Sequence, residues 1–157
     1  MSNDIDRQLE ETTQLAIAKL VRLREQMVDT MDAVQTAARL VRDSYHSDTN
    51  PDKVGHADTF RLRFALEHSV EGLRDELIRT RKYRTEHIAL LEETISTGRA
   101  GLADMIADDP TDPKIAVRRH HLALLEQLLA KNVAILKMCD DADAVVAEAD
   151  EIIVTIQ

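Results

Sequence analysis

The three prolines of the chain lie in two short stretches, and this distribution limits how the rest can fold. Pro51 lies within residues 44–58, whereas Pro110 and Pro113 lie within residues 107–113. Proline interrupts helices and central strands because it lacks a backbone N–H and fixes φ. The long segments that remain predict three helices, joined by two loops. The helices are expected over about 3–44, 58–107 and 113–155, and the loops over about 45–57 and 108–112.

Apolar residues in the three long segments recur in steps of three and four, which is the period of one face of an α-helix. Helices of this length exceed those of most globular domains and are typical of coiled-coil-like packing. Short loops can join such rods only as antiparallel neighbours. The sequence therefore predicts an all-α fold, an elongated antiparallel three-helix bundle (up-down-up) that forms one domain over residues 1–157.

The second segment carries an apolar seam that is expected to open with two bulky residues, Phe60 and Phe64. Gly98 and Gly101 follow near its end. Each glycine costs about 1 kcal/mol relative to alanine within a helix, so a kink or fraying is expected there. In the third segment, Asp112 is placed to cap the helix.

Four basic residues fall within residues 79–84 of a chain whose formal net charge is −9. On a helical wheel they spread round the whole helix, whereas a nucleic-acid reader would gather them on one face. Arg84 lies at the centre of the apolar seam and Arg81 at its margin. A charge in a seam is costly unless it is paired and hydrogen-bonded, so these arginines need partners.

A turn near residue 110 would bring the arginines level with a group of aspartates on the third segment. We therefore expect a polar layer in the middle of the bundle, in which a seam asparagine also fixes the register. The residues of this layer are Arg81, Arg84, Asn132, Asp140, Asp141 and Asp143. His87 lies one or two turns away. Two alternatives stay open for the same residues: a solvated face, or a site for an anionic ligand or a partner.

The first segment has an apolar face that is wider than a two-stranded seam. Ile17, Val21 and Val28 provide the extra width. Such a face predicts contact with at least two other helices, and it is also a candidate self-association face. We therefore expect a homo-oligomer, most simply a dimer.

The composition argues against several classes of partner. Asp and Glu number 29 against 20 Lys and Arg, and this balance repels nucleic acids and anionic lipids. No run approaches the roughly 18 apolar residues of a membrane span. The single cysteine, Cys139, cannot form an internal disulfide. We therefore expect a cytoplasmic protein that neither spans a membrane nor binds nucleic acid.

No catalytic or cofactor motif occurs in the sequence. The Glu-x-x-His pair of di-iron bundles, the Gly-x-Ser-x-Gly elbow and the phosphate-binding glycine loop are all missing. Cys139 would need a positioned histidine to act as a nucleophile, and the sequence marks none. We therefore predict no enzyme activity, no catalytic residue, no cofactor and no metal site.

The function expected from these features is that of a non-enzymatic helical scaffold or adaptor. It would act through protein–protein contacts of its bundle surfaces, with a partner that the sequence does not identify. The alternative is a ligand-sensing or regulatory helical bundle that binds an anionic small molecule at the mid-bundle arginine cluster.

Overall fold

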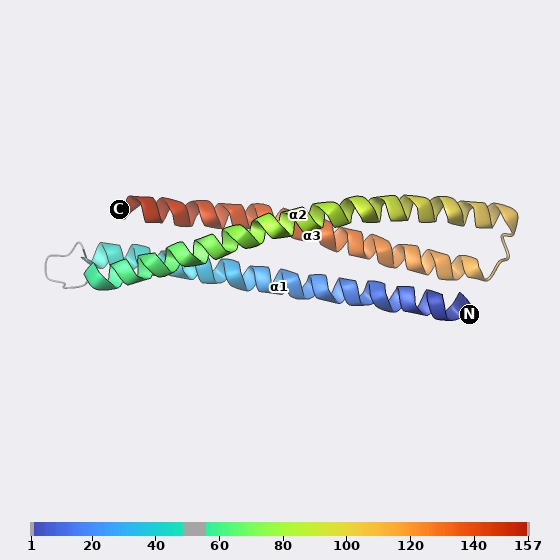
Figure 1. Cartoon of the computed structure of the whole chain (residues 1–157), viewed down its shortest axis with the longest axis horizontal. Helices are drawn as coiled ribbons and strands as arrows, with labels where there is room; N and C mark the ends of the chain where they lie inside the picture. Colours follow the sequence, from blue (N-terminus) through green and yellow to red (C-terminus); the bar gives the residue numbers. More distant parts are fainter. Residues whose placement is uncertain (1, 49–55, 157) are drawn as a thin grey trace. The chain divides into compact units, whose positions relative to one another are not determined.

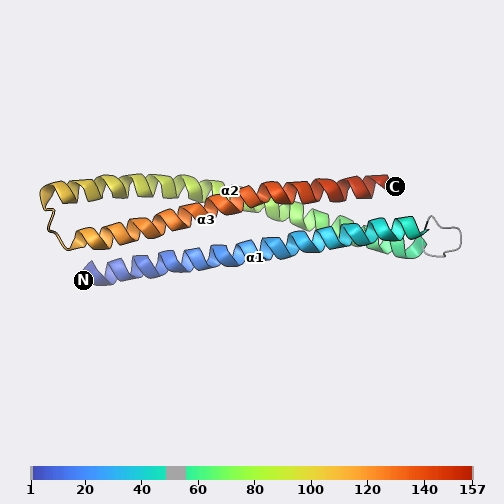
Figure 2. The same ribbon diagram turned by 180° about the vertical axis from the view of Figure 1, so that it is seen from behind.

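The structure is a computed structural model that describes residues 2–48 and 56–156. Over these residues it contains three α-helices and no strand, so the fold class is all-α as predicted. The helices are α1 (Ser2–Asp48), α2 (His56–Asp108) and α3 (Lys114–Thr155), shown in Figure 1 and from behind in Figure 2. The largest difference from the predicted bounds is the end of α1. The middle of the first predicted loop lies outside the described residues.

The contacts of the chain divide it into two compact units, each of which takes a part of every helix. The first unit combines Met1–Arg24 with Lys82–Leu136, and the second unit combines Glu25–Arg81 with Lys137–Gln157. The two units are of nearly equal length.

The second unit has the larger apolar core. Its buried apolar residues are Met27, Val34, Ala38, Val41, Leu66, Val70, Leu73, Leu77, Cys139, Ala142, Val145, Val146 and Ala149. On α1, Met27, Val34 and Val41 follow one another at seven-residue steps, which is the repeat of coiled-coil-like packing. The helical bundle that the sequence predicts is therefore well packed in this unit.

The first unit has fewer buried apolar residues. They are Leu20, Ile95, Ile115, Leu122, Leu124, Leu125 and Ile135. Three of them, Ile95, Leu122 and Leu125, form one cluster against which partly buried leucines pack. The core of this unit is thus concentrated where the end of α2 meets the start of α3.

The start of the α2 seam differs from the prediction. Phe60 and Phe64 are both 67% exposed, whereas Thr59 is buried. Thr59 precedes Leu66 by one heptad, while Phe60 is rotated about 100° away from it on the helix. The Thr59 hydroxyl is 2.7 Å from the Ser44 hydroxyl, which provides a hydrogen-bonding partner for a buried polar group. The seam therefore begins with a threonine, and the expectation that both phenylalanines belong to it is wrong.

The end of α2 also differs from the prediction, because the helix continues without interruption to Asp108. A Cβ atom placed on Gly98 would lie only 2.7 Å from Cδ2 of Leu122, whereas one on Gly101 would meet nothing within 4 Å. Gly98 thus permits the close approach of Leu122 from α3. Of the two expected features, the fraying is wrong, because packing in the first unit offsets the low helix propensity of glycine, and the kink stays a prediction.

The connection between α2 and α3 is held by two aspartates. Asp112 accepts a hydrogen bond from the backbone N–H of Lys114 at 2.9 Å, so its predicted capping role is confirmed. Asp109 accepts hydrogen bonds from the backbone N–H and the hydroxyl of Thr111, which lower the pKa of the Asp109 carboxyl. These bonds fix the chain direction at the start of α3.

Candidate functional site

The residues of the predicted polar layer fall into two groups, one in each unit. The group of the second unit is Arg81, Asp140, Asp141 and Asp143. The group of the first unit is Arg84 and Asn132. Each group has its own contacts.

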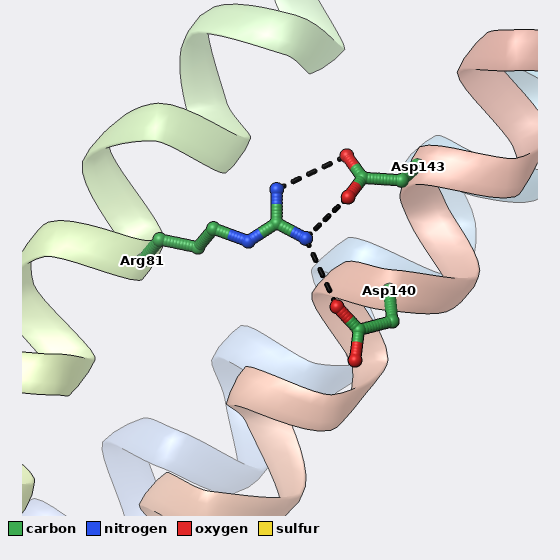
Figure 3. A network of polar contacts seen from close by, with 3 residues as sticks. All are labelled: Arg81, Asp140 and Asp143. Carbon is green, nitrogen blue, oxygen red and sulfur yellow. Dashed lines mark hydrogen bonds and ion pairs between the residues drawn. The ribbon is translucent and has the colours of Figure 1, made fainter.

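Arg81 extends from α2 towards two aspartates on α3 (Figure 3). Its Nη1 donates to Asp143 Oδ1 at 3.0 Å, and its Nη2 donates to the other oxygen of the same carboxylate. Nη2 also lies 3.1 Å from Asp140 Oδ1. The Asp143 carboxylate is therefore held in the bidentate geometry that an arginine fork favours.

The electrostatics of the Arg81 group follow from these bonds. Hydrogen bonding from Arg81 lowers the pKa of Asp143 below its ordinary value, and the same bonds raise the pKa of Arg81. The aspartate side chains are 53% and 79% exposed, so solvent screens the pairs. Both terminal nitrogens of Arg81 are occupied by aspartates, which leaves this arginine poorly suited to a second anion.

Asp141, a member of the Arg81 group, and Cys139, its neighbour in sequence, add no reactive chemistry. Asp141 is exposed and forms no ion pair within the described part of the chain. Cys139 is fully buried, and burial raises the pKa of its thiol. A buried thiol with a raised pKa is a weak nucleophile because the thiolate is the reactive form.

Arg84 has a different environment from Arg81. Its Nη1 donates to Asn132 Oδ1 at 2.9 Å, and Asn132 donates in turn to the Leu128 carbonyl oxygen at 2.9 Å. The Arg84 Nε is buried and has no hydrogen-bond partner. Over the described ranges no carboxylate pairs with Arg84, and burial lowers the pKa of its guanidinium. Arg84 therefore has a neutral partner in place of an aspartate.

An open groove of about 400 Å³ lies beside Arg84 in the first unit. Its polar lining consists of Lys19, Arg84, His87 and Asn132. Its apolar lining consists of Ala16, Leu20, Leu23, Leu90, Leu91 and Leu128. Small-molecule sites typically measure roughly 300–1,000 Å³ and combine a mainly apolar wall with a few polar groups, so the groove has the make-up of such a site.

Two other grooves have a different charge pattern. One, also in the first unit, is lined by Glu10 and His120, whose side chains meet at 3.0 Å. Another, in the second unit, is lined by Arg42 together with Glu148 and Glu151. Both contain acids beside their cations, whereas no acid lines the groove beside Arg84.

The sequence did not single out several residues that the structure places in contact. Arg74 pairs with Asp150 at 2.5 Å in the second unit, and Arg99 pairs with Glu126 at 2.5 Å in the first. The antiparallel register that predicts an Arg81–Asp140 contact also places these two pairs side by side. The same register could therefore have predicted them. Lys19 was missed because a helical wheel does not show which exposed lysine borders a groove.

The candidate self-association face remains partly accessible. Val21 and Val28 are 40% and 39% exposed, and Ile17 is half-buried. Ile17 and Val21 belong to the first unit and Val28 to the second. Self-association through these residues stays a prediction.

Metal-binding clusters and membrane-spanning helices are both absent from the described part of the chain. Within residues 2–48 and 56–156, no three His, Cys, Asp or Glu side chains are grouped so that they could hold a metal ion. Over the same ranges, no helix has an apolar stretch long enough to cross a membrane.

Comparisons with protein-family models, with curated proteins and with solved structures give no match.

Proposed function

We propose that this chain is a non-enzymatic helical scaffold or adaptor that acts through protein–protein contacts of its bundle surfaces. The observation that carries the proposal is the exposure of Phe60 and Phe64. They are the chain's two phenylalanines, each is 67% exposed, and they lie one turn apart on α2. Aromatic side chains are enriched at protein interfaces, where their burial contributes much of the binding energy.

The proposed arrangement of the helices is an up-down-up bundle. Pairs within each unit support the antiparallel course of α2 and α3 in this arrangement, because residue numbers fall on α3 as they rise on α2. In the second unit the pairs are Arg74 with Asp150 and Arg81 with Asp143. In the first unit Arg84 contacts Asn132 and Arg99 pairs with Glu126. A bundle of this kind presents whole helix faces to partners.

The scaffold is proposed to form a homodimer. Two sets of exposed apolar residues are available for the contact: the phenylalanine pair, Phe60 and Phe64, and the valines of α1, Val21 and Val28. Burying either set against a second copy would remove apolar surface from water, which favours association.

Light scattering after size-exclusion chromatography tests this proposal across micromolar concentrations. A Phe60→Ser/Phe64→Ser variant should lower the measured mass if the phenylalanines form the contact, and Val21→Glu/Val28→Glu should lower it if the valines do. Gln26→Glu, an exposed change on another flank of α1, is the control. A compact monomer at every concentration would remove self-association from the account.

The second candidate function is a ligand-sensing or regulatory bundle that binds an anionic small molecule. Arg84 favours it, because its buried Nε has no hydrogen-bond partner and its contact with Asn132 provides no charge. Arg81 contributes less than the sequence suggested, since aspartates already occupy its donors. A panel of organic acids and phosphates should raise the melting temperature of the wild-type protein but not that of Arg84→Met.

A further inference from the structure

The Arg84 guanidinium has no anionic partner within the described residues. A guanidinium carries five N–H donors, and the structure gives Arg84 one hydrogen bond, from Nη1 to the Asn132 side chain. Burial already penalises its charged form, and no carboxylate offsets that penalty within the described residues. An anion that entered the groove would supply the missing partner.

The charged residues that line the groove beside Arg84 are all cations. Lys19 adds a second cation, and no Asp or Glu lines the groove in a chain whose formal net charge is −9. The electrostatic field inside the groove therefore favours a negative group more than the average surface of the protein does.

The same groove is also largely apolar. Five leucines line it: Leu20, Leu23, Leu90, Leu91 and Leu128. Leu90 is 60% exposed, so covering it would remove apolar surface from water. A small hydrophilic anion would leave these leucines uncovered, whereas an anion with an apolar chain would cover them.

We propose that this groove binds a monocarboxylate with an aliphatic chain, with its carboxylate beside Arg84 and Lys19 and its chain along the leucines. The proposal rests on the second candidate function, the binding of an anion at Arg84, and names the class of ligand.

The geometry of Arg84 suits a carboxylate head group. Because Nη1 bonds to Asn132, Nε and Nη2 are the donors of Arg84 that keep no hydrogen-bond partner within the described residues. Nε is covered by protein, so Nη2 is the free donor of Arg84 that a carboxylate in the groove would meet first. Asn132 fixes the guanidinium from the opposite side, which limits the entropy lost on binding.

Isothermal titration of the full chain with three probes tests the proposal. Decanoate carries both the carboxylate and the chain, 1-decanol carries the chain without the charge, and acetate carries the charge without the chain. Decanoate is expected to bind one-to-one and more tightly than either of the others.

Matched variants locate the binding site. Arg84→Met is expected to weaken decanoate binding about tenfold or more, because charge-assisted hydrogen bonds are lost. Arg81→Met, one turn away in the second unit, should bind as the wild type does. Leu90→Glu, which places an acid at an exposed position of the groove, should also weaken binding and should leave the fold intact.

The outcomes separate the ligand class from the function on which it rests. If acetate binds as tightly as decanoate, the site holds anions without an apolar preference, which overturns the proposal and leaves the second candidate function standing. If decanol binds as tightly, charge is irrelevant and both fail. Decanoate binding of the same strength in Arg84→Met and Leu90→Glu would also overturn the proposal. So would a wild-type protein that does not bind decanoate.

Discussion

Arg81 and Arg84 lie three positions apart on α2 and belong to different units, and their surroundings differ in charge. Arg81 is held by two aspartates of α3, whereas Arg84 has only the amide oxygen of Asn132. The position of a basic residue in a helix therefore says little about its role. A nearby carboxylate decides whether an arginine forms an ion pair within the protein or keeps donors that a ligand can use.

The two units differ in packing as well. Nearly twice as many buried apolar residues lie in the second unit as in the first, although the units are of similar length. Between Leu77 and Ile95, α2 has no buried apolar residue, and Arg84 lies within that interval. We infer that the second unit supplies most of the stability, whereas the first, which holds the groove beside Arg84, is the less stable part.

The largest expected effect compares one leucine from each unit. Leu73→Ala removes a side chain that is 1% exposed from the second core and should lower the free energy of unfolding by about 3 kcal/mol. Leu91→Ala removes a half-buried side chain that lines the groove and should cost about 1 kcal/mol. Urea unfolding followed by circular dichroism measures both. Equal losses would mean that the units are packed alike.

The next effect concerns the arginines themselves. Replacing Arg84 and Asn132 together by Met and Leu should stabilise the protein by about 1 kcal/mol, because an incompletely paired charge gives way to apolar packing. Arg84→Met alone should be less favourable, since it leaves the buried Asn132 oxygen without a donor. Arg81→Met should destabilise by less than about 1 kcal/mol. A double-mutant cycle measures the coupling, and a destabilised double variant would contradict our interpretation of Arg84.

The glycines give a smaller contrast within the first unit. Gly101→Ala should raise the free energy of unfolding by up to about 1 kcal/mol, since the site is open and alanine favours helix. Gly98→Ala should gain less or lose, because the new methyl group would displace Leu122. Gly72→Ala, at an open site in the second unit, is the control and should behave like Gly101→Ala. A Gly98→Ala gain as large as the control would show that Leu122 moves freely.

The smallest effect is the pH dependence of the Arg81–Asp143 pair. The pKa of Asp143 is lower in the folded state than its ordinary value, so the pair stabilises the fold above that ordinary value, about 3.9. That contribution is lost as the pH falls through the folded pKa. Because the Asp143 side chain is 53% exposed and solvent screens the pair, the contribution should amount to a few tenths of a kcal/mol, about the lower end for surface pairs. Stability curves of wild type and Asp143→Asn should therefore converge at low pH; a gap that widened there would be inconsistent.

Much of the fold could be predicted because breakers and periodicity act locally. The positions of the prolines set the helix bounds to within a few residues, and Asp112 provided the expected cap. Phe60 and Phe64 were misassigned because a seam can be continued by a polar residue, and Thr59 rather than Phe60 keeps the heptad with Leu66. Hydrophobicity alone does not reveal that choice, since a buried threonine needs a hydrogen-bond partner from another helix.

The candidate site was predictable only in part. Positions on a helical wheel indicated that Arg81 and Arg84 need partners. An antiparallel turn near residue 110 then predicted that Asp140 and Asp143 lie near Arg81. The sequence could not show that Arg84 would bond to Asn132, because a shift of about two turns along α3, from Asp140 to Asn132, decides between an aspartate and an amide. The groove depends on three helices at once, which no periodicity within a single segment can describe.

NMR of the guanidinium groups tests the contrast between the two arginines most directly. The protein is labelled with ¹⁵N in its arginines. Arg81→Lys and Arg84→Lys variants assign the two signals. The spectrum of wild type is compared at neutral pH with that of Asp140→Asn/Asp143→Asn. The account predicts that the Arg81 resonances shift and that those of Arg84 stay in place. Movement of the Arg84 resonances, or an unchanged Arg81 signal, would contradict it.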